Sequence, residues 1–306
     1  MLETLLEISK SAADTNDWQL VEATLADMAA AFALFHPHRN IRKLAVFGSA
    51  RSTASDPAYL LAMELAEEAV NCGFEVMTGA GGGVMEAANR GAGTDKSFGL
   101  DVQLPFEHLT NRYIDSPARL LSFSYFHTRK LFFLRETDAV VVLPGGFGTL
   151  DELFEALTLI QTAKNPPVPV VLLAPLGDNY WHNWQNYIDT SLLERGFVST
   201  QDSCIYRSAN SAKQALHLID GFYKVFKASH YNANKLQLNL NYYLPENELT
   251  LINKKFRYLL LEGEIYSTNN LSRGSNVELC FDQRQIGGLY ALIDHLNGLD
   301  LSHCAQ

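Results

Sequence analysis

Three apolar runs in this chain each contain or end at a glycine turn, and each is followed by residues with the spacing of an amphipathic helix. The runs are KLAVFGSAR (43 to 51), FEVMTG (74 to 79) and AVVVLP (139 to 144). Apolar strands that alternate with amphipathic helices indicate a parallel sheet covered on both faces, because each helical crossover packs against one face. The expected fold class is therefore α/β, with a doubly wound parallel sheet. In such sheets ligands lie beyond the carboxyl ends of the strands, where the three glycine turns fall.

Start and stop signals support the helix that follows the first run. Asp56 suits the N-cap, Pro57 the first helical position and Gly73 the residue after the helix. The same reasoning predicts helices at 84 to 92, 127 to 138, 150 to 163 and 179 to 196, strands at 97 to 104 and 168 to 175, and an apolar run at 121 to 126.

Three regions follow from this pattern. Residues 1 to 40 have apolar side chains at spacings of three and four up to Pro37, which predicts an N-terminal helical extension. Residues 41 to 227 hold the alternating strands and helices. Residues 228 to 306 are expected to form a small C-terminal appendage, because KLQLNLNYY alternates with period two and IGGLYALIDHLNGL is typical of a closing helix. Nothing in the appendage indicates a function.

The overall charge limits the partners that the chain is expected to bind. A formal net charge of -10 disfavours broad attraction to nucleic acid polymers or to an anionic membrane. No apolar run is expected to reach the length of roughly 18 to 20 residues that a membrane-spanning helix needs, and the acidic start MLETLLEISK lacks the basic region of a signal peptide. We therefore expect a cytoplasmic protein with a small-molecule partner and no membrane association.

Neither the cysteines nor the histidines have the spacing of a metal site. The four cysteines contain no C-x-x-C pair, which favours free thiols over a zinc site or a disulfide framework. The scattered histidines favour ordinary surface or capping roles over ligation, so no metal is expected. The residues concerned are Cys72, Cys204, Cys280, Cys304, His36, His38, His108, His127 and His182.

The segment PGGFGTLDE, residues 144 to 152, predicts an anion site. A helix that begins at about Leu150, directly after a strand and a glycine turn, presents free backbone N–H groups, and glycines let an anion approach them closely. The alternative is that glycine only permits a tight turn. A second glycine turn, AGGG at 80 to 83, favours phosphate binding, because one ligand would explain both turns. The chain has neither G-x-x-x-x-G-K-[ST] nor G-x-G-x-x-G at these turns, which disfavours a P-loop NTPase and a dinucleotide oxidoreductase.

Charged residues accompany this turn. Asp151 and Glu152 could simply be acids that the helix N-terminus favours. Alternatively, since a bound phosphate would repel a carboxylate, one of them acts on another part of the ligand, such as a sugar carbon that becomes cationic. Arg129 and Lys130 lie at the start of a predicted helix, where the helix dipole does not favour a cation. They form either a solvated surface pair or part of the site.

Taken together, these motifs resemble the LOG family of cytokinin riboside 5′-monophosphate phosphoribohydrolases, which also carries the label "lysine decarboxylase". PGGFGTLDE matches P-G-G-x-G-T-x-x-E, TRK at 128 to 130 resembles the arginine-lysine signature, and TGAGGGVMEAANRGA at 78 to 92 resembles the second glycine turn. The resemblance runs from about Ile41 to about Lys224, and Ala80 and Val84 depart from the usual spacing of that second turn.

The resemblance implies a Rossmann-like homodimer that needs no cofactor and hydrolyses the N-glycosidic bond of a nucleoside 5′-monophosphate, of the AMP or cytokinin riboside monophosphate type. It carries the catalytic acid over to Glu152 and the catalytic arginine to Arg129, while Asp151 occupies a variable position. The residues expected to bind phosphate or substrate are Gly145, Gly146, Gly148, Thr149, Gly81, Gly82, Gly83, Ser49, Lys130 and Met85.

Two other functions remain open at this point. A non-catalytic carrier of a nucleotide or of another phosphorylated ligand, such as molybdenum cofactor, would have little use for a carboxylate beside a phosphate, so Glu152 and Arg129 favour the enzyme. A pyridoxal-phosphate-dependent decarboxylase would need a Schiff-base lysine, for which no context is recognisable. The aromatic residues Tyr180, Trp181, Trp184 and Tyr187 are at helical spacing and are expected in the core or in a dimer surface.

Overall fold

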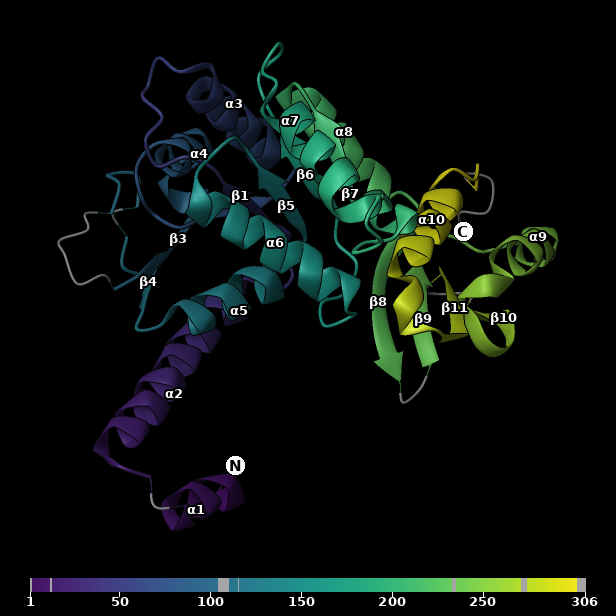
Figure 1. Ribbon diagram of the computed structural model, residues 1–306, viewed down its shortest axis with the longest axis horizontal. Coiled ribbons are helices and arrows are strands. Elements are labelled where there is room, and N and C mark those ends of the chain that lie inside the picture. Colours follow the sequence, from purple (N-terminus) through teal and green to yellow (C-terminus); the bar gives the residue numbers. More distant parts are fainter. Residues whose placement is uncertain are drawn as a thin grey trace.

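The computed structural model describes residues 2–11, 13–103, 110–114, 116–232, 235–270 and 274–301. His108 and Cys304 lie outside these ranges. The described chain contains a helical N-terminal arm, a seven-stranded sheet with helices on both faces, and a smaller four-stranded sheet (Figure 1).

The larger sheet is entirely parallel and confirms the predicted α/β, Rossmann-like architecture. Its strands are β1 (Lys43–Phe47), β2 (Glu75–Thr78), β3 (Ser97–Val102), β4 (Leu120–Phe123), β5 (Ala139–Val142), β6 (Val170–Leu173) and β7 (Tyr206–Ala209). They lie in the order β4-β3-β2-β1-β5-β6-β7. The strand order reverses between β1 and β5, and a doubly wound sheet binds its ligand at that switch point.

Side chains alternate across the sheet and build a core on each face. In β1, Leu44 and Val46 belong to one core, whereas Ala45 and Phe47 belong to the other. Helices α3 (Pro57–Asn71), α4 (Val84–Ala92) and α8 (Ala212–Phe222) cover the first face. Helices α2 (Thr15–Phe35), α5 (Phe126–Glu136), α6 (Phe147–Gln161) and α7 (Tyr180–Tyr187) contribute to the second.

The smaller sheet is antiparallel and shares the second core. It comprises β8 (Phe226–Asn232), β9 (Lys235–Leu240), β10 (Leu260–Asn270) and β11 (Gly274–Phe281) in the order β10-β11-β9-β8, with α9 (Glu246–Phe256) and α10 (Ile286–Asn297). The Tyr290 hydroxyl of α10 contacts the backbone N and O of Val168, at 3.1 and 2.7 Å. The side chain of Asn297 accepts from Val225 N and Phe226 N. Strand β9 and helix α10 confirm two predicted elements, whereas α9 has no counterpart in the sequence-based prediction.

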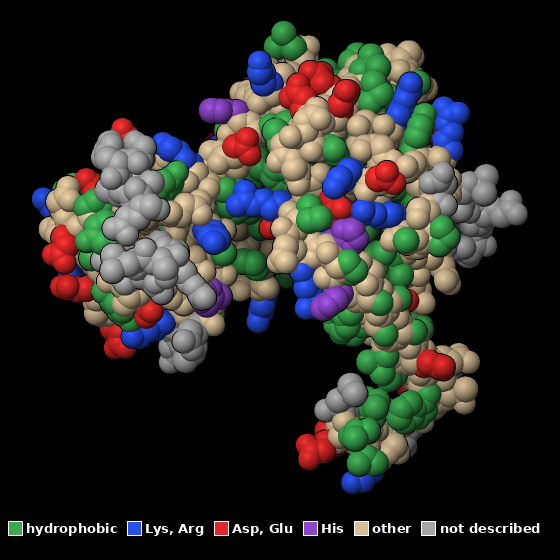
Figure 2. Space-filling view, turned by 180° about the vertical axis from the view of Figure 1, so that it is seen from behind, with side chains coloured by type: hydrophobic (Ala, Val, Ile, Leu, Met, Phe, Trp, Pro, Cys, Tyr) green, Lys and Arg blue, Asp and Glu red, His purple; other side chains and the backbone are tan. Residues whose placement is uncertain are grey.

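The N-terminal extension is an arm made of α1 (Leu2–Lys10) and α2 (Figures 1 and 2). Asp27 of α2 is buried and accepts hydrogen bonds from Thr128 Oγ1 and Ser124 N, which joins α2 to the start of α5. Apolar side chains remain exposed along the arm, among them Leu2, Leu6, Trp18, Leu20, Leu25 and Phe32.

The expectation that no segment is long and apolar enough to span a membrane is wrong for this arm. Thr15–His38 is a helical segment of 24 residues that is long and apolar enough, by length and composition, to cross a membrane. Its alanines and its few charges give it this character, although it has no long uninterrupted run of large apolar residues. The end of this segment nevertheless packs on the protein, since Ala31 and Phe35 are buried.

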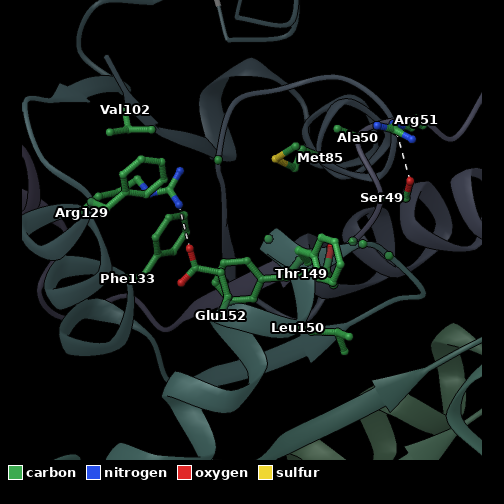
Figure 3. A pocket seen from close by; sticks show the side chains of 18 of the residues that line it. Ser49, Ala50, Arg51, Met85, Val102, Arg129, Phe133, Thr149, Leu150 and Glu152 are labelled. Carbon is green, nitrogen blue, oxygen red and sulfur yellow. Dashed lines mark hydrogen bonds and ion pairs between the residues drawn. The ribbon is translucent and has the colours of Figure 1, made fainter. Parts of the chain in front are cut away.

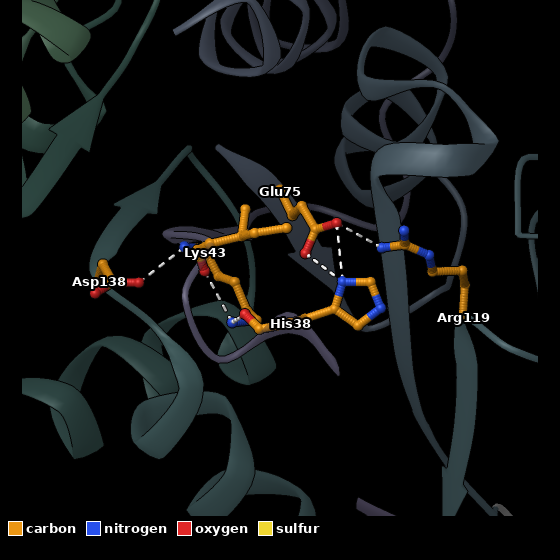
Figure 4. Close-up of polar contacts among 6 residues, drawn as sticks. His38, Lys43, Glu75, Arg119 and Asp138 are labelled. Carbon is orange, nitrogen blue, oxygen red and sulfur yellow. Dashed lines mark hydrogen bonds and ion pairs between the residues drawn. The ribbon is translucent and has the colours of Figure 1, made fainter. Parts of the chain in front are cut away.

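A buried polar cluster holds the end of the arm against the sheet (Figure 4). Glu75 is fully buried and lies 3.0 Å from His38 Nδ1 and 2.9 Å from Arg119 Nη1. Burial lowers the pKa of His38, and the charge of Glu75 opposes that shift. Lys43 Nζ donates to the carbonyl oxygens of His38 and Ile41, and Lys43 N donates to Asp138. His38 therefore has a structural partner in this cluster.

Two helices differ from their predicted bounds. Helix α6 begins at Phe147, three residues before the predicted Leu150, with Gly146 as its N-cap. The predicted helix from 179 to 196 is α-helical only over Tyr180–Tyr187 and continues as a π-helix over Ile188–Leu193. Gly148 and Thr149 consequently belong to the first turn of α6.

Candidate active site

A cleft of about 780 Å³ opens at the carboxyl ends of β1 and β5, at the switch point of the sheet (Figure 3). Helix α6 forms its floor, and α5 and the loop after β1 form its walls. The lining residues are Phe47, Gly48, Ser49, Ala50, Arg51, Gly79, Met85, Asp101, Val102, Phe126, Arg129, Phe133, Gly145, Gly146, Phe147, Gly148, Thr149, Leu150 and Glu152.

The first turn of α6 forms a cradle of backbone N–H groups at the floor of the cleft. The first N–H groups of a helix have no partner within the helix, and they carry the positive end of its dipole. A Cβ at Gly146 or Gly148 would meet no protein atom within 4 Å, and neither glycine has a positive φ. Side chains are therefore compatible with the fold at both positions, and glycine leaves the backbone open to a ligand.

Gly145 has a different role in the cradle. A Cβ at Gly145 would lie 2.1 Å from Thr149 Oγ1, so glycine is needed to let Thr149 pack against the turn. The Tyr180 hydroxyl donates to the carbonyl oxygen of Gly145 at 2.6 Å, and Ser49 N donates to that of Pro144 at 3.1 Å. These contacts fix the turn before the helix from both sides.

A carboxylate and an arginine meet beside the cradle. Arg129 Nη2 of α5 donates to Glu152 Oε1 of α6 at 2.7 Å (Figure 3). The Glu152 side chain is only 8% exposed and the Arg129 side chain 14%. Arg129 lies over the rings of Phe126 and Phe133, with its Cζ 5.1 and 5.8 Å from the ring centroids. Its Nε is buried and has no hydrogen-bond partner within the described part of the chain.

Lys130 supports Glu152 from outside the cleft. Its Nζ lies 3.1 Å from Glu152 Oε2, 2.9 Å from Asp151 Oδ2 and 2.6 Å from Glu155 Oε2. Burial raises the pKa of Glu152 above its ordinary value, and the charges of Arg129 and Lys130 oppose that rise. Burial acts to lower the pKa of Lys130, but its contacts with Glu155, Asp151 and Glu152 outweigh this effect and raise that pKa. Lys130 is therefore held as a cation by three carboxylates.

The cleft collects most of the residues that the sequence singled out. Lining it are Glu152, Arg129, Gly145, Gly146, Gly148, Thr149, Ser49 and Met85. Gly81, Gly82, Gly83 and Lys130 are not among the lining residues. Gly83 has a φ of 65°, and a Cβ there would lie 2.2 Å from the carbonyl oxygen of Ser49, so this turn packs against the loop after β1. The predicted ligand contacts of Gly81, Gly82, Gly83 and Lys130 thus gain no support from the lining of the cleft.

Several residues of the site were missed by sequence reasoning. Arg51 lines the cleft from the loop after β1 and Asp101 from the end of β3, and Phe126 and Phe133 line it from α5. The sequence held an indication of both charged residues. Arg51 is a cation three residues after the glycine of GSAR, and Asp101 is the charged residue in the otherwise mostly apolar predicted strand SFGLDVQL. Tyr180 was expected in a core or dimer surface; it packs against the core, and its hydroxyl also contacts the turn before α6, which the sequence did not indicate.

Comparison with known proteins gives one matching family. Residues 79–219 match the family described as "Possible lysine decarboxylase". This stretch includes α5, the cradle and Glu152. It leaves out the N-terminal arm and the smaller sheet.

Individual relatives are plant phosphoribohydrolases. The probable cytokinin riboside 5′-monophosphate phosphoribohydrolase LOGL3 of Oryza sativa subsp. japonica is 30% identical over 163 residues, which is 53% of this chain and 75% of that protein. LOG2 of Arabidopsis thaliana, a cytokinin riboside 5′-monophosphate phosphoribohydrolase, is 28% identical over 59% of this chain and 84% of its own length. LOG4 of Arabidopsis thaliana, also named a cytokinin riboside 5′-monophosphate phosphoribohydrolase, is 38% identical over 31% of this chain. That match spans 43% of the length of LOG4, which is less than half.

Proposed function

The chain belongs to the LOG family of cytokinin riboside 5′-monophosphate phosphoribohydrolases, and on this basis we propose that it hydrolyses the N-glycosidic bond of a nucleoside 5′-monophosphate. The products are the free base and ribose 5-phosphate. The observation that carries the proposal is the Arg129–Glu152 pair beside an open helix N-terminus within one cleft. We further propose an adenine-type base, as in AMP or a cytokinin riboside monophosphate, because this is the substrate type that the family resemblance implies.

The cradle holds the phosphate in this mechanism. Backbone N–H groups of the first turn of α6 and the Thr149 hydroxyl donate hydrogen bonds to the phosphate oxygens. The helix dipole adds about 0.3 to 1 kcal/mol, so the directed hydrogen bonds supply most of the binding free energy. Binding the phosphate fixes the ribose against Glu152, which lies three residues after Thr149 on the same helix.

Glu152 acts on the sugar. As the C1′–N bond breaks, its electron pair leaves with the base and positive charge develops on the ribose ring. The buried Glu152 carboxylate stabilises that charge and accepts a proton from the water that attacks C1′. The base nitrogen takes up a proton, so the net change is the addition of one water. Arg129 orients Glu152, and its unpaired Nε donates to the bound ribose or base.

Product analysis tests the proposed function. Purified protein is incubated with 5′-monophosphates of adenosine, an N6-prenylated adenosine, guanosine, cytidine and uridine, and with the matching nucleosides, and base and ribose 5-phosphate are quantified by chromatography. We expect equimolar base and ribose 5-phosphate from monophosphates only, with adenine-type bases preferred. Binding of a nucleotide without release of any base would contradict the proposal and favour a carrier.

A side chain in the cradle is expected to weaken phosphate binding without affecting folding. Gly148→Ala places a methyl group in open space at the floor of the cleft, so the dissociation constant for ribose 5-phosphate should rise about tenfold or more, which corresponds to the loss of one or two charge-assisted hydrogen bonds. The matched control is Gly221→Ala, which also lies in a helix with no atom within 4 Å of its Cβ. Equal affinities of Gly148→Ala and the unmutated protein, by calorimetry, would exclude the cradle as the phosphate site.

The pH dependence of kcat/KM is expected to follow the ionisation of Glu152. Activity needs the carboxylate, so the rate rises with pH as Glu152 loses its proton, and the raised pKa places that rise above the ordinary 4.5. Lys130→Met removes a cation 3.1 Å from Oε2 and raises the pKa further, which moves the acidic limb of the profile to higher pH. The exposed Lys213→Met serves as control. An unmoved acidic limb in Lys130→Met would show that Glu152 does not set it.

A further inference from the structure

Arg51 and Ser49 stand at the opposite end of the cleft from the Arg129–Glu152 pair (Figure 3). Both belong to the loop after β1, and this loop is fixed to its neighbours. Ser49 N donates to the carbonyl oxygen of Pro144, at the start of the cradle turn, and Val84 N donates to that of Ser49 at 2.9 Å. The loop is therefore held between the cradle turn and the N-terminus of α4, and Arg51 lines the same cleft as the cradle.

Arg51 is the cation of the cleft that the described residues leave without a carboxylate. Arg129 is paired with Glu152, and Lys130, which does not line the cleft, is paired with three carboxylates including that of Glu152. The guanidinium of Arg51 makes no ion pair within the described ranges, and the residue is exposed. An unpaired guanidinium that lines the same cleft as a helix N-terminus favours a phosphate oxygen as its partner.

Ser49 has a proton to donate to the same partner. Its Oγ accepts a hydrogen bond from Arg51 N at 3.1 Å, which uses a lone pair of the hydroxyl and leaves its O–H available. Ser49 and Arg51 can thus donate together to an anion held by the cradle.

A second cavity of about 580 Å³ continues beyond this point and shares Ser49 and Gly145 with the cleft. It carries the carboxylates of Asp56 and Asp178. Thr53 N donates to Asp56 Oδ2, and Tyr180 N donates to Asp178 Oδ1 at 2.8 Å, so backbone contacts fix both side chains. Negative charge at this place opposes a phosphate chain that extends past the cradle.

We propose that Arg51, with Ser49, completes the phosphate site and selects a phosphorylated ligand over the free nucleoside, while Asp56 and Asp178 restrict that ligand to one phosphate. The proposal rests on the proposed function for the identity of the nucleotide. It concerns residues that determine specificity and that take no part in breaking the glycosidic bond.

The first test measures binding apart from catalysis. Isothermal titration calorimetry with ribose 5-phosphate should give a dissociation constant roughly 10- to 100-fold higher for Arg51→Gln than for the unmutated protein, on the scale of a lost charge-assisted hydrogen bond. Binding of adenosine should be unchanged, and the dependence of affinity on salt should become weaker. Arg39→Gln, an exposed arginine that precedes the start of β1 and so lies at the edge of the sheet opposite the cleft, controls for the loss of one positive charge. Equal affinity for ribose 5-phosphate in Arg51→Gln and Arg39→Gln would overturn the role of Arg51.

The second test addresses the length of the phosphate chain. Asp178→Asn keeps an oxygen that can accept from Tyr180 N, so only the charge is lost. We expect the ratio of ADP affinity to AMP affinity to rise about 3- to 10-fold in this variant. An unchanged ratio would overturn the role of the acidic cavity. Both tests measure binding and do not depend on catalysis. If Arg51→Gln weakens ribose 5-phosphate binding but the unmutated protein releases no base, only the proposed function is refuted. If base is released but Arg51→Gln binds ribose 5-phosphate as tightly as the control, only this inference is refuted.

Discussion

Glu152→Gln is expected to lower kcat by about 100-fold or more, the scale on which a preorganised electrostatic group acts. Glutamine keeps the size of the side chain and its contact with Arg129, but it cannot stabilise the positive charge on the ribose or accept the proton of the attacking water. The dissociation constant for the nucleotide should change little, because the phosphate is held by the cradle. Single-turnover measurements of base release, together with calorimetry, give the two quantities.

Asp151→Asn is the matched control for this variant. Asp151 precedes Glu152 directly and also contacts Lys130, but its side chain is 63% exposed and does not line the cleft. Its loss should leave kcat within about twofold, as is usual for an exposed ion pair. Full turnover in Glu152→Gln would remove this carboxylate from the mechanism.

Arg129→Ala is expected to lower kcat/KM by about 100-fold while the protein remains folded. The variant loses the group that orients Glu152 and the Nε that is free to donate to the ligand. Folding should survive because Lys130 stays 3.1 Å from Glu152 and still balances its charge. Circular dichroism and thermal unfolding monitor the fold, and base release monitors the reaction.

Two further variants make this result interpretable. Arg135→Ala removes a more exposed arginine from the same helix, with a side chain 43% exposed, and should retain activity. Arg129→Lys keeps the charge without the planar fork, and we expect it to recover only a small part of the activity. An unfolded Arg129→Ala together with a folded, fully active Arg129→Lys would assign Arg129 a structural role.

The order of strands and helices could be predicted because it depends on local patterns. Apolar runs, Pro57 and the glycines at helix ends located β1, β2, β5 and most helices to within a few residues. The cleft could be predicted for a related reason: in a parallel sheet, turns at the carboxyl ends of the strands meet at one edge. The pattern P-G-G-x-G-T-x-x-E also predicts that the glycine turn and Glu152 lie together at the start of one helix, and both lie there in α6. The homodimer and the cytoplasmic location remain predictions.

Long-range packing decided the roles that the local patterns left open. Arg129 and Lys130 are adjacent in the sequence, yet successive side chains of a helix point in different directions, so Arg129 faces the cleft and Lys130 faces Asp151 and Glu155. Gly83 permits a close approach of two loops, which a glycine pattern in the sequence cannot distinguish from ligand binding. Arg51 and Asp101 reach the cleft from two different segments, and Tyr180 contacts the turn before α6 from a third.

The sequence by itself determined the α/β class, the glycine turn and the carboxylate that follows it, because each depends on residues close together in the chain. Only the tertiary structure decided which charges are neutralised and which remain available to a ligand. That distinction depends on distances between α5, α6 and the loop after β1, which are separated by many residues and meet only when the sheet has formed.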